Sequence, residues 1–328
     1  MTYKKCKTFL TLFNKKSKVL IVINADPDSI ACALAVKRLL WKKVLKTCIV
    51  HFNIVTRPDN LAMIEYTAPE LLFIDKIKKE DYNTFVLVDS QPDHNQYFSQ
   101  FEFDAIIDHH ELTCNQAKFF DIRSNYGACA TILTQYLKAQ RIKPSRKLSA
   151  ALMLGIKTDT SDFTRQASLK DIKAFQYLYQ FADINIVTKV SKATFNKDEL
   201  DFLGKVILKR KIINNRLFYH TDNIDNPDKL VIVADFFLSL AKINWSIISG
   251  ICNSKLIIII RNDGLRKNAG NTAQEAFSIY GSAGGHKTMA RAELDLKLIK
   301  KNLKLTSNQS IKKWIIKSIS QTAGKRID

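Results

Sequence analysis

The stretch VLIVINADPDSIACALAVKRLL, residues 19–40, contains the pattern from which the fold class of this chain follows. It opens with a run of β-branched residues, which predicts a buried strand over 19–24. Apolar residues then recur three and four positions apart, which predicts a helix over 29–43. Two carboxylates, Asp26 and Asp28, therefore lie between the end of the predicted strand and the start of the predicted helix.

The same alternation continues through the first half of the chain. The pattern predicts further strands over 48–55, 71–75, 84–89 and 105–110, and helices over 127–140 and 145–156. Strands that alternate with helices are typical of a parallel sheet covered by helices, which is the α/β class. In open sheets of this class, ligands bind at the carboxyl ends of the strands.

A second α/β unit follows a charged segment. That segment, FNKDELDFLGKVILKRK, predicts a connecting helix. Beyond it, the pattern predicts strands over 217–220, 245–252 and 255–261, and helices over 228–241 and 271–280. We therefore expect a first domain over residues 1–190, a helical linker over 191–211 and a smaller α/β domain over 212–328.

The composition limits the class of protein. A chain of 328 residues with 46% hydrophobic residues can form two buried cores. Its six cysteines show no paired spacing, which favours reduced thiols and a cytoplasmic location. No secretion signal and no membrane span is expected. The net charge of +20 favours polyanionic partners such as nucleic acid or phosphates, although a generally lysine-rich surface would give the same value.

Acidic and histidine side chains follow the ends of several expected elements. They are Asp89 in VLVDSQP, Asp108, His109 and His110 in AIIDHHE, and Asp159 in GIKTDT. Together with Asp26 and Asp28, they should converge at one edge of the sheet. A single Asp at such a place is often a helix cap, but so much negative charge together indicates bound divalent cations. This mixed ligand set suits Mn²⁺, with Mg²⁺ as the alternative, and two ions would activate water for attack on a phosphoryl group.

The second unit contains the glycine-rich stretch GSAGGHKTMA, residues 281–290. Glycines such as Gly284 and Gly285 let the backbone approach a phosphate closely. Side chains that could donate to a phosphate there are His286, Lys287, Arg291 and, at the end of a predicted strand, Arg261. A paired glycine before a histidine is weak evidence by itself, and Arg261 is equally compatible with ordinary surface charge.

Taken in order, these motifs resemble those of the DHH/DHHA1 phosphoesterases, most closely the branch of nanoRNases and phosphoadenosine-phosphate phosphatases. NADPDSIACALA, VLVDSQP, AIIDHHE and GIKTDT resemble the motifs of the first domain, and GSAGGHKTMA resembles the GGH signature of the second. The resemblance runs from about Val19 to Leu294. It implies two α/β domains that face each other across a cleft, and it is compatible with a homodimer formed through the first domain.

The resemblance also implies roles for individual residues. The metal ligands would be Asp26, Asp28, Asp89, His109 and Asp159, with Asp89 bridging two ions. His110 would face the substrate as a proton donor or phosphate contact, and Asp108 would orient the histidines. The GGH segment, ending at His286, would hold the distal phosphate or the terminal nucleotide.

The chain departs from the family pattern near its first motif. Many members have a histidine ligand where this chain has Val22, and the exonuclease branch has an aspartate where it has Asn24. Asn24 is thus a further candidate ligand, because an amide oxygen can coordinate a hard cation. Arg291 is a second departure, since the family usually has small residues there.

These observations predict an Mn²⁺-dependent phosphodiesterase or phosphomonoesterase. Its substrates would be short oligoribonucleotides, phosphoadenosine phosphate or a cyclic dinucleotide. One alternative is a catalytically weakened protein that only binds nucleotides or nucleic acid. Another is a pyrophosphate or polyphosphate hydrolase that uses the same metal chemistry. Metal content and hydrolysis of a generic phosphodiester would discriminate the enzyme from the binding protein.

Overall fold

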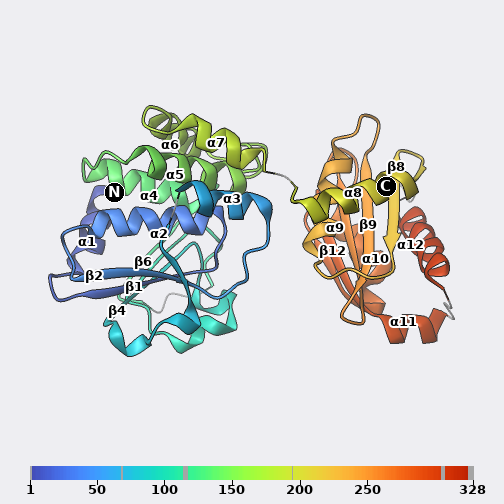
Figure 1. Cartoon of the computed structure of the whole chain (residues 1–328), viewed down its shortest axis with the longest axis horizontal. Helices are drawn as coiled ribbons and strands as arrows, with labels where there is room; N and C mark the ends of the chain where they lie inside the picture. Colours follow the sequence, from blue (N-terminus) through green and yellow to red (C-terminus); the bar gives the residue numbers. More distant parts are fainter. Residues whose placement is uncertain (1, 68, 114–116, 194, 304–306, 324–328) are drawn as a thin grey trace. The chain divides into compact units, whose positions relative to one another are not determined.

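The computed structural model describes residues 2–67, 69–113, 117–193, 195–303 and 307–323. The chain divides into two compact parts, which we call unit 1 (Met1–Thr194) and unit 2 (Phe195–Asp328). In Figure 1, unit 1 runs from blue to green and unit 2 from yellow to red. The helix expected as a linker forms α8 (Lys197–Lys209), and it belongs to unit 2 because Leu203 and Val206 are buried in that unit's core.

Unit 1 is built on a six-stranded sheet with the strand order β3-β2-β1-β4-β5-β6, and every neighbouring pair is parallel. This confirms the predicted parallel α/β class. The strands are β1 (Lys18–Ile23), β2 (Lys46–His51), β3 (Leu71–Phe73), β4 (Thr84–Val88), β5 (Ala105–Asp108) and β6 (Phe119–Ile122). The sequence did not predict β6, whose four residues FFDI are too short for a clear alternating pattern.

Helices cover one face of this sheet, as Figure 1 shows. They are α1 (Thr2–Thr11), α2 (Pro27–Leu40), α3 (Pro58–Thr67), α4 (Cys129–Ala139), α5 (Arg146–Asp159), α6 (Leu169–Tyr179) and α7 (Ile184–Ser191). The side chains of β1 alternate between the two faces of the sheet. Ile21 and Ile23 belong to the core shared with the helices, whereas Leu20 and Val22 belong to a second core on the opposite face. Short 3₁₀ segments follow β3 and β4: η1 (Ile74–Lys76), η2 (Lys79–Asp81), η3 (Pro92–His94) and η4 (Gln96–Gln100). Phe98 of η4 belongs to that second core, and Ile74 of η1 packs against it.

Unit 2 contains a second six-stranded sheet with the order β11-β12-β10-β9-β8-β7. Only β8 and β9 pair in parallel, so the sheet is mixed. The strands are β7 (Lys211–Ile213), β8 (Arg216–Thr221), β9 (Trp245–Cys252), β10 (Lys255–Asn262), β11 (Gly281–Gly285) and β12 (Met289–Asp295). The glycine-rich stretch thus forms an edge strand, which its sequence did not predict because glycine is uncommon in strands.

The helices of unit 2 lie on both faces of its sheet. They are α8, α9 (Asp228–Leu238), α10 (Ala269–Phe277), α11 (Leu296–Leu303) and α12 (Asn308–Ala323), and a 3₁₀ turn, η5 (Ser278–Tyr280), follows α10. Apolar residues of α8 and α9 pack on one face, and those of α10, α11 and α12 pack on the other.

Two further expectations can be compared with the described residues. Five cysteines, Cys6, Cys32, Cys48, Cys129 and Cys252, are free thiols, as predicted. The sixth, Cys114, lies outside the described residues. Among the described helices, none combines the length and apolar character that crossing a membrane requires.

Candidate metal centre

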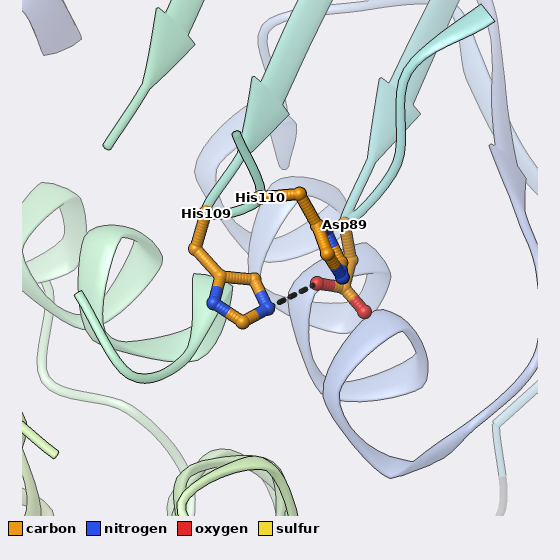
Figure 2. A group of neighbouring side chains, drawn as sticks. All are labelled: Asp89, His109 and His110. Atoms are coloured by element: carbon orange, nitrogen blue, oxygen red, sulfur yellow. Dashed lines mark ion pairs between the residues drawn. The ribbon is translucent and has the colours of Figure 1, made fainter. Parts of the chain in front are cut away.

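Four side chains from four separate segments meet at the carboxyl edge of the sheet of unit 1. Asp28 comes from the first turn of α2, Asp89 follows β4, His109 follows β5, and Asp159 ends α5. One potential ligand atom of each lies within 4.8 Å of the others. We call this group the carboxylate–histidine cluster. Figure 2 shows Asp89, His109 and His110 projecting from the ends of their strands.

The imidazole of His109 is oriented with one nitrogen toward the carboxylates. Its Nδ1 lies 3.3 Å from the carbonyl oxygen of Tyr126, to which it donates in the neutral tautomer. Its Nε2 lies 3.0 Å from Oδ2 of Asp159 and 3.4 Å from Oδ1 of Asp89. Its Nε2 thus contacts two carboxylates, and the Asp89 Oδ1 is buried without a hydrogen-bond partner among the described residues. An imidazole nitrogen and carboxylate oxygens that converge in this way fit a bound cation.

Asp89 has an unusual backbone conformation. Its φ is 59°, in the left-handed region, and its N–H donates to the carbonyl of Ile107 at 2.8 Å. Aspartate and asparagine enter this region more easily than most residues with a side chain. Backbone strain of this kind is concentrated at functional sites. Here it turns the chain sharply after β4, so that the carboxylate reaches the cluster.

Burial and mutual repulsion dominate the electrostatics of the cluster. Burial, together with the neighbouring carboxylates, raises the pKa values of Asp28 and Asp89 well above their usual range. Burial works against the charged form of His109, but the adjacent carboxylates, Asp159 first, raise its pKa to about 9. A divalent cation would relieve this repulsion. Three carboxylates and one imidazole are a ligand set suited to Mn²⁺, so the residues fit the expected metal.

Asp28 has a second role inside the fold. Its carboxylate is fully buried and accepts hydrogen bonds from the backbone N–H groups of Cys129 at 2.6 Å and Ala130 at 2.9 Å. These donors belong to the first turn of α4, where the helix dipole favours negative charge. Asp28 therefore connects the first turn of α4 to the first turn of α2 and is at the same time a member of the carboxylate–histidine cluster.

Asp26 lies beside the cluster but is not one of its four members. Its Oδ1 accepts a hydrogen bond from the N–H of Ser29 at 2.9 Å and caps α2. Burial, and then repulsion from Asp159, raises the pKa of Asp26 to about 6. Asp26 therefore interacts electrostatically with the carboxylate–histidine cluster, to which Asp159 belongs. Asn24 is exposed and Val22 is fully buried in the second core of unit 1. Coordination by Asp26 or Asn24 stays a prediction.

Asp108 holds His110 beside the cluster. Its fully buried Oδ1 accepts from the His109 N–H and from Nδ1 of His110, each at 2.8 Å. Burial would raise the pKa of Asp108, but the contact with His110 outweighs it and the pKa is lowered. The side chain of His110 is half exposed. Asp108 contacts only the Nδ1 of this ring and leaves its Nε2 free of that contact.

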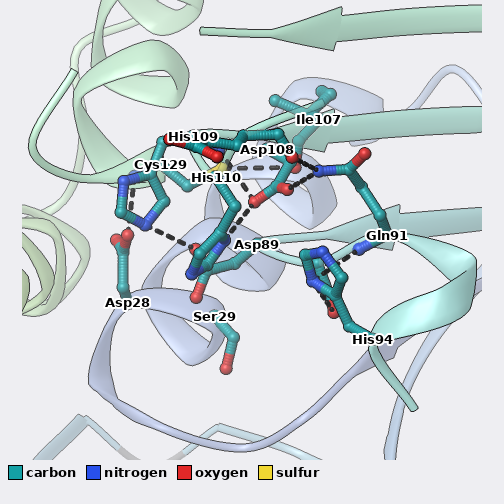
Figure 3. A network of polar contacts seen from close by, with 12 residues as sticks. Asp28, Ser29, Asp89, Gln91, His94, Ile107, Asp108, His109, His110 and Cys129 are labelled. Carbon is teal, nitrogen blue, oxygen red and sulfur yellow. Dashed lines mark hydrogen bonds and ion pairs between the residues drawn. The ribbon is translucent and has the colours of Figure 1, made fainter. Parts of the chain in front are cut away.

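Sequence reasoning missed Gln91, which supports this arrangement. The side chain is fully buried, and its Nε2 donates to Oδ2 of Asp108 and to the carbonyl of Glu111, both at 2.8 Å. Its Oε1 accepts from the N–H of Thr113 at 2.8 Å. Figure 3 shows Gln91 behind Asp108, on the side away from His109. The only sign in the sequence was a polar residue two positions after Asp89.

His94 was also missed. Its Nδ1 lies 3.3 Å from the backbone N–H of Gln91, which donates to it. Its ring centre is 5.4 Å from that of His110 in an edge-to-face contact. One ligand atom each of His94, Asp108 and His110 lies within 4.8 Å of the others. The two imidazoles therefore stand together beside the carboxylate–histidine cluster.

We expect Gln91→Ala to lower activity about 10-fold, the lower end of the range found when a partner of a metal ligand is lost, because Gln91 acts one step further out, through Asp108. The reason for the loss is that Oδ2 of Asp108 would lose the hydrogen bond that Gln91 donates to it. The backbone at Glu111 and Thr113 would also lose its hydrogen bonds to the Gln91 side chain. Steady-state turnover at saturating Mn²⁺ measures the effect. Gln96→Ala is a matched control, because Gln96 is exposed on the neighbouring η4. Equal activities of the two variants would contradict a positioning role.

In unit 2, the predicted phosphate-binding residues are only partly brought together. Gly284 on β11 pairs directly with Arg291 on β12, and His286 follows β11 in an exposed turn. Arg261, at the end of β10, makes an ion pair with Asp235 of α9, so its charge already has a partner. The assignment of these residues to substrate binding stays a prediction.

The start of α10 is closed by the same turn. The N–H groups of Ala269 and Gly270 donate to the carbonyls of Lys287 and His286, each at 2.9 Å. A Cβ at Gly270 would lie 2.3 Å from the carbonyl oxygen of Gly285, so the two backbones touch. The glycines here allow close packing of strand on helix.

Comparison with known proteins agrees with the fold. Residues 18–156 match the DHH family, N-terminal domain. The chain is 33% identical over 289 residues to an uncharacterized protein of Methanocaldococcus jannaschii; the match covers 87% of this chain but only 60% of that protein's length.

Two solved structures share the fold at low sequence identity. An exopolyphosphatase-related protein from Bacteroides fragilis is 14% identical with a TM-score of 0.72, covering 98% of this chain and 96% of the other. RecJ from Thermus thermophilus, solved with Mn²⁺, is 12% identical with a TM-score of 0.55, covering 99% and 55%. Three of the four residues of the carboxylate–histidine cluster, Asp28, Asp89 and His109, thus lie in the stretch that matches the DHH family, N-terminal domain, and the chain shares its fold with these two solved structures.

Proposed function

We propose that this chain is a metal-dependent phosphoesterase that hydrolyses short oligoribonucleotides or phosphorylated nucleotides. The observation that carries the proposal is the carboxylate–histidine cluster, in which Nε2 of His109 lies 3.0 Å from Oδ2 of Asp159 and 3.4 Å from Oδ1 of Asp89, an atom that is buried without a hydrogen-bond partner in the part of the chain that the structure describes. The match of residues 18–156 to the DHH family supports it. The net charge of +20 favours an anionic substrate.

The cluster would hold the catalytic cation. Asp28, Asp89, His109 and Asp159 would supply the ligands, and Asp26 and Asn24 are candidates for a second ion. A bound divalent ion supplies Lewis-acid stabilisation of a phosphoryl group and activation of water. Asp108 keeps the Nδ1 proton of His110 in place. His110 can then contact a phosphoryl oxygen or protonate a leaving group through Nε2.

The first test is a substrate panel measured on metal-depleted protein, with Mn²⁺, Mg²⁺ or no metal added back. The panel contains a dinucleotide, a longer RNA, phosphoadenosine phosphate, a cyclic dinucleotide and pyrophosphate. We expect hydrolysis of at least one nucleotide substrate, faster with Mn²⁺ than with Mg²⁺ because of the imidazole ligand, and none without metal.

The other outcomes separate the alternatives. Activity in excess chelator would refute the metal mechanism. Cleavage of pyrophosphate alone would indicate a pyrophosphate or polyphosphate hydrolase, the class suggested by the name of the Bacteroides fragilis protein. Binding of metal and nucleotide without turnover of any substrate would indicate a binding protein.

For His286→Ala we expect a KM about 10- to 150-fold higher and an unchanged content of bound metal. The reason is that His286 is an exposed side chain of unit 2, whereas the four cluster residues belong to unit 1. Loss of one hydrogen bond to a charged phosphate accounts for about 1.5–3 kcal/mol of binding. Steady-state kinetics and metal analysis of the purified variant measure the two effects. Loss of metal with an unchanged KM would contradict the proposed role.

A further inference from the structure

Unit 1 contains a cavity that is remote from the carboxylate–histidine cluster. It has a volume of about 510 Å³ and lies at the carboxyl end of α2 and the amino end of α5. Asp28 is in the first turn of α2, whereas Trp41 follows its last residue. At a rise of 1.5 Å per residue, a helix of this length separates the two places by roughly 20 Å. None of the residues lining the cavity belongs to the cluster.

An exposed indole forms one wall of this cavity. Trp41 is 60% exposed, and the neighbouring apolar wall is made by Leu34 and Leu148. The cations of Arg38 and Lys42 lie 4.9 Å and 4.6 Å from the centre of the indole ring. A large aromatic side chain held at the surface between cations is suited to planar ligands that carry negative charge.

The turn that presents the indole is strained. Lys42, the next residue, has a φ of 60°, in the left-handed region that non-glycine residues rarely adopt. Its carbonyl accepts a hydrogen bond from the ammonium group of Lys15, which holds the turn. Strain of about 1–3 kcal/mol persists only where the surrounding structure enforces it. The backbone of the turn that carries Trp41 is therefore held by the fold.

The remaining wall is basic. Lys37, Arg38 and Lys147 line the cavity, and no acidic residue is among its described lining residues. Glu70, which pairs with Lys37 at 2.6 Å, is 86% exposed in its side chain. Lys147 is exposed in the first turn of α5, where the helix dipole adds partial positive charge. The cavity thus combines an apolar, aromatic wall with an anion-attracting end.

We propose that this cavity is a binding site for a nucleoside phosphate. The base packs against Trp41 and the side chains of Leu34 and Leu148, and the phosphates lie at Lys147 and the start of α5. The volume is within the range of about 300–1,000 Å³ found for small-ligand sites. The proposal does not depend on the proposed function, because it uses neither the cluster nor a metal.

The test is titration of the full-length protein with ATP in excess EDTA, followed by tryptophan fluorescence and calorimetry. Trp41 is the exposed reporter, because Trp245 is only 5% exposed and Trp314 packs against Phe277. We expect saturable quenching by ATP. Adenosine and tripolyphosphate should each bind at least about tenfold more weakly than ATP, because adenosine lacks the phosphates and tripolyphosphate lacks the base.

Variants separate this site from the metal centre. Lys147→Glu and Trp41→Ala should weaken ATP binding in calorimetry about tenfold or more, whereas Trp41→Phe should stay within about threefold because it keeps an aromatic wall. Lys173→Glu, an exposed residue of α6 outside the cavity, is the matched control and should leave binding unchanged.

The same titration is repeated with Asp89→Asn, which alters the metal centre alone and should bind ATP like the wild type. The proposal is overturned if tripolyphosphate binds as tightly as ATP, if Lys147→Glu has no effect, or if Asp89→Asn abolishes binding. The last result would place the nucleotide at the metal centre.

Discussion

Asp89→Asn should reduce turnover at least about 1,000-fold, a loss of about 4 kcal/mol of transition-state stabilisation. The carboxylate faces Nε2 of His109 at 3.4 Å and has an oxygen without a hydrogen-bond partner, so it is placed to hold a cation. Asparagine is the informative replacement because it keeps the size of the side chain and tolerates the φ of 59°. The measurement is turnover of the best substrate at saturating Mn²⁺.

The same variant should not be less stable than the wild type when metal is absent. Burial and the surrounding carboxylates raise the pKa of Asp89 well above its usual range, so its charge is unfavourable in the metal-free protein. We expect an unchanged or slightly higher Tm in EDTA, in line with the trade-off between activity and stability at functional sites. Asp81→Asn, at an exposed position of η2, is the control for charge removal. Turnover of Asp89→Asn within tenfold of wild type would refute the assignment of Asp89.

Gly155→Ala should lower activity about 100-fold and also destabilise unit 1. A Cβ at Gly155 would lie 2.7 Å from Oδ1 of Asp28 and 3.0 Å from its Cα, distances at which Asp28 has to move. Asp28 cannot move freely, because the N–H groups of Cys129 and Ala130 hold its carboxylate. Misplacing a catalytic group by about 1 Å can cost 100-fold in rate. Turnover and chemical denaturation of the variant measure the two effects.

The matched control is Gly204→Ala, in the middle of α8. A Cβ there meets no atom within 4 Å. Replacing glycine by alanine in a helix is favourable by up to about 1 kcal/mol, so this variant should be more stable than the wild type. At Gly155 the same gain is outweighed by overpacking, which typically costs 1–3 kcal/mol. If both variants are stabilised and active, the contact between Gly155 and Asp28 does not constrain the site.

The sequence predicted the parts of unit 1 in which one local pattern suffices. Strong β-branched runs predicted β1 and β4, and helical spacing predicted α2 and α5. Since carboxyl ends of parallel strands share one edge, the meeting of Asp89 and His109 could also be expected from the sequence. The metal assignment of these residues stays a prediction.

What could not be predicted depends on contacts between distant segments. Gln91 lies in the motif stretch VLVDSQP, but its role appears only in the structure, where its amide donates to Asp108 and to the loop after it. Asp28 could be expected to be a ligand, but its hydrogen bonds to the start of α4 require the packed structure. The 3₁₀ segments under the sheet have no periodic pattern, because irregular packing of aromatic side chains, such as Phe98 and Phe101, defines them.

The four residues of the carboxylate–histidine cluster come from widely separated parts of unit 1, from α2 at one end to the end of α5 at the other. An ion held by all of them would close several long chain loops at once. Cross-links that close long loops remove more freedom from the unfolded chain than cross-links between neighbours. Metal binding would then be coupled to folding. Local unfolding of any one segment that carries a ligand would lower the affinity of unit 1 for the ion. The availability of metal would thereby govern the lifetime of unit 1 against proteases.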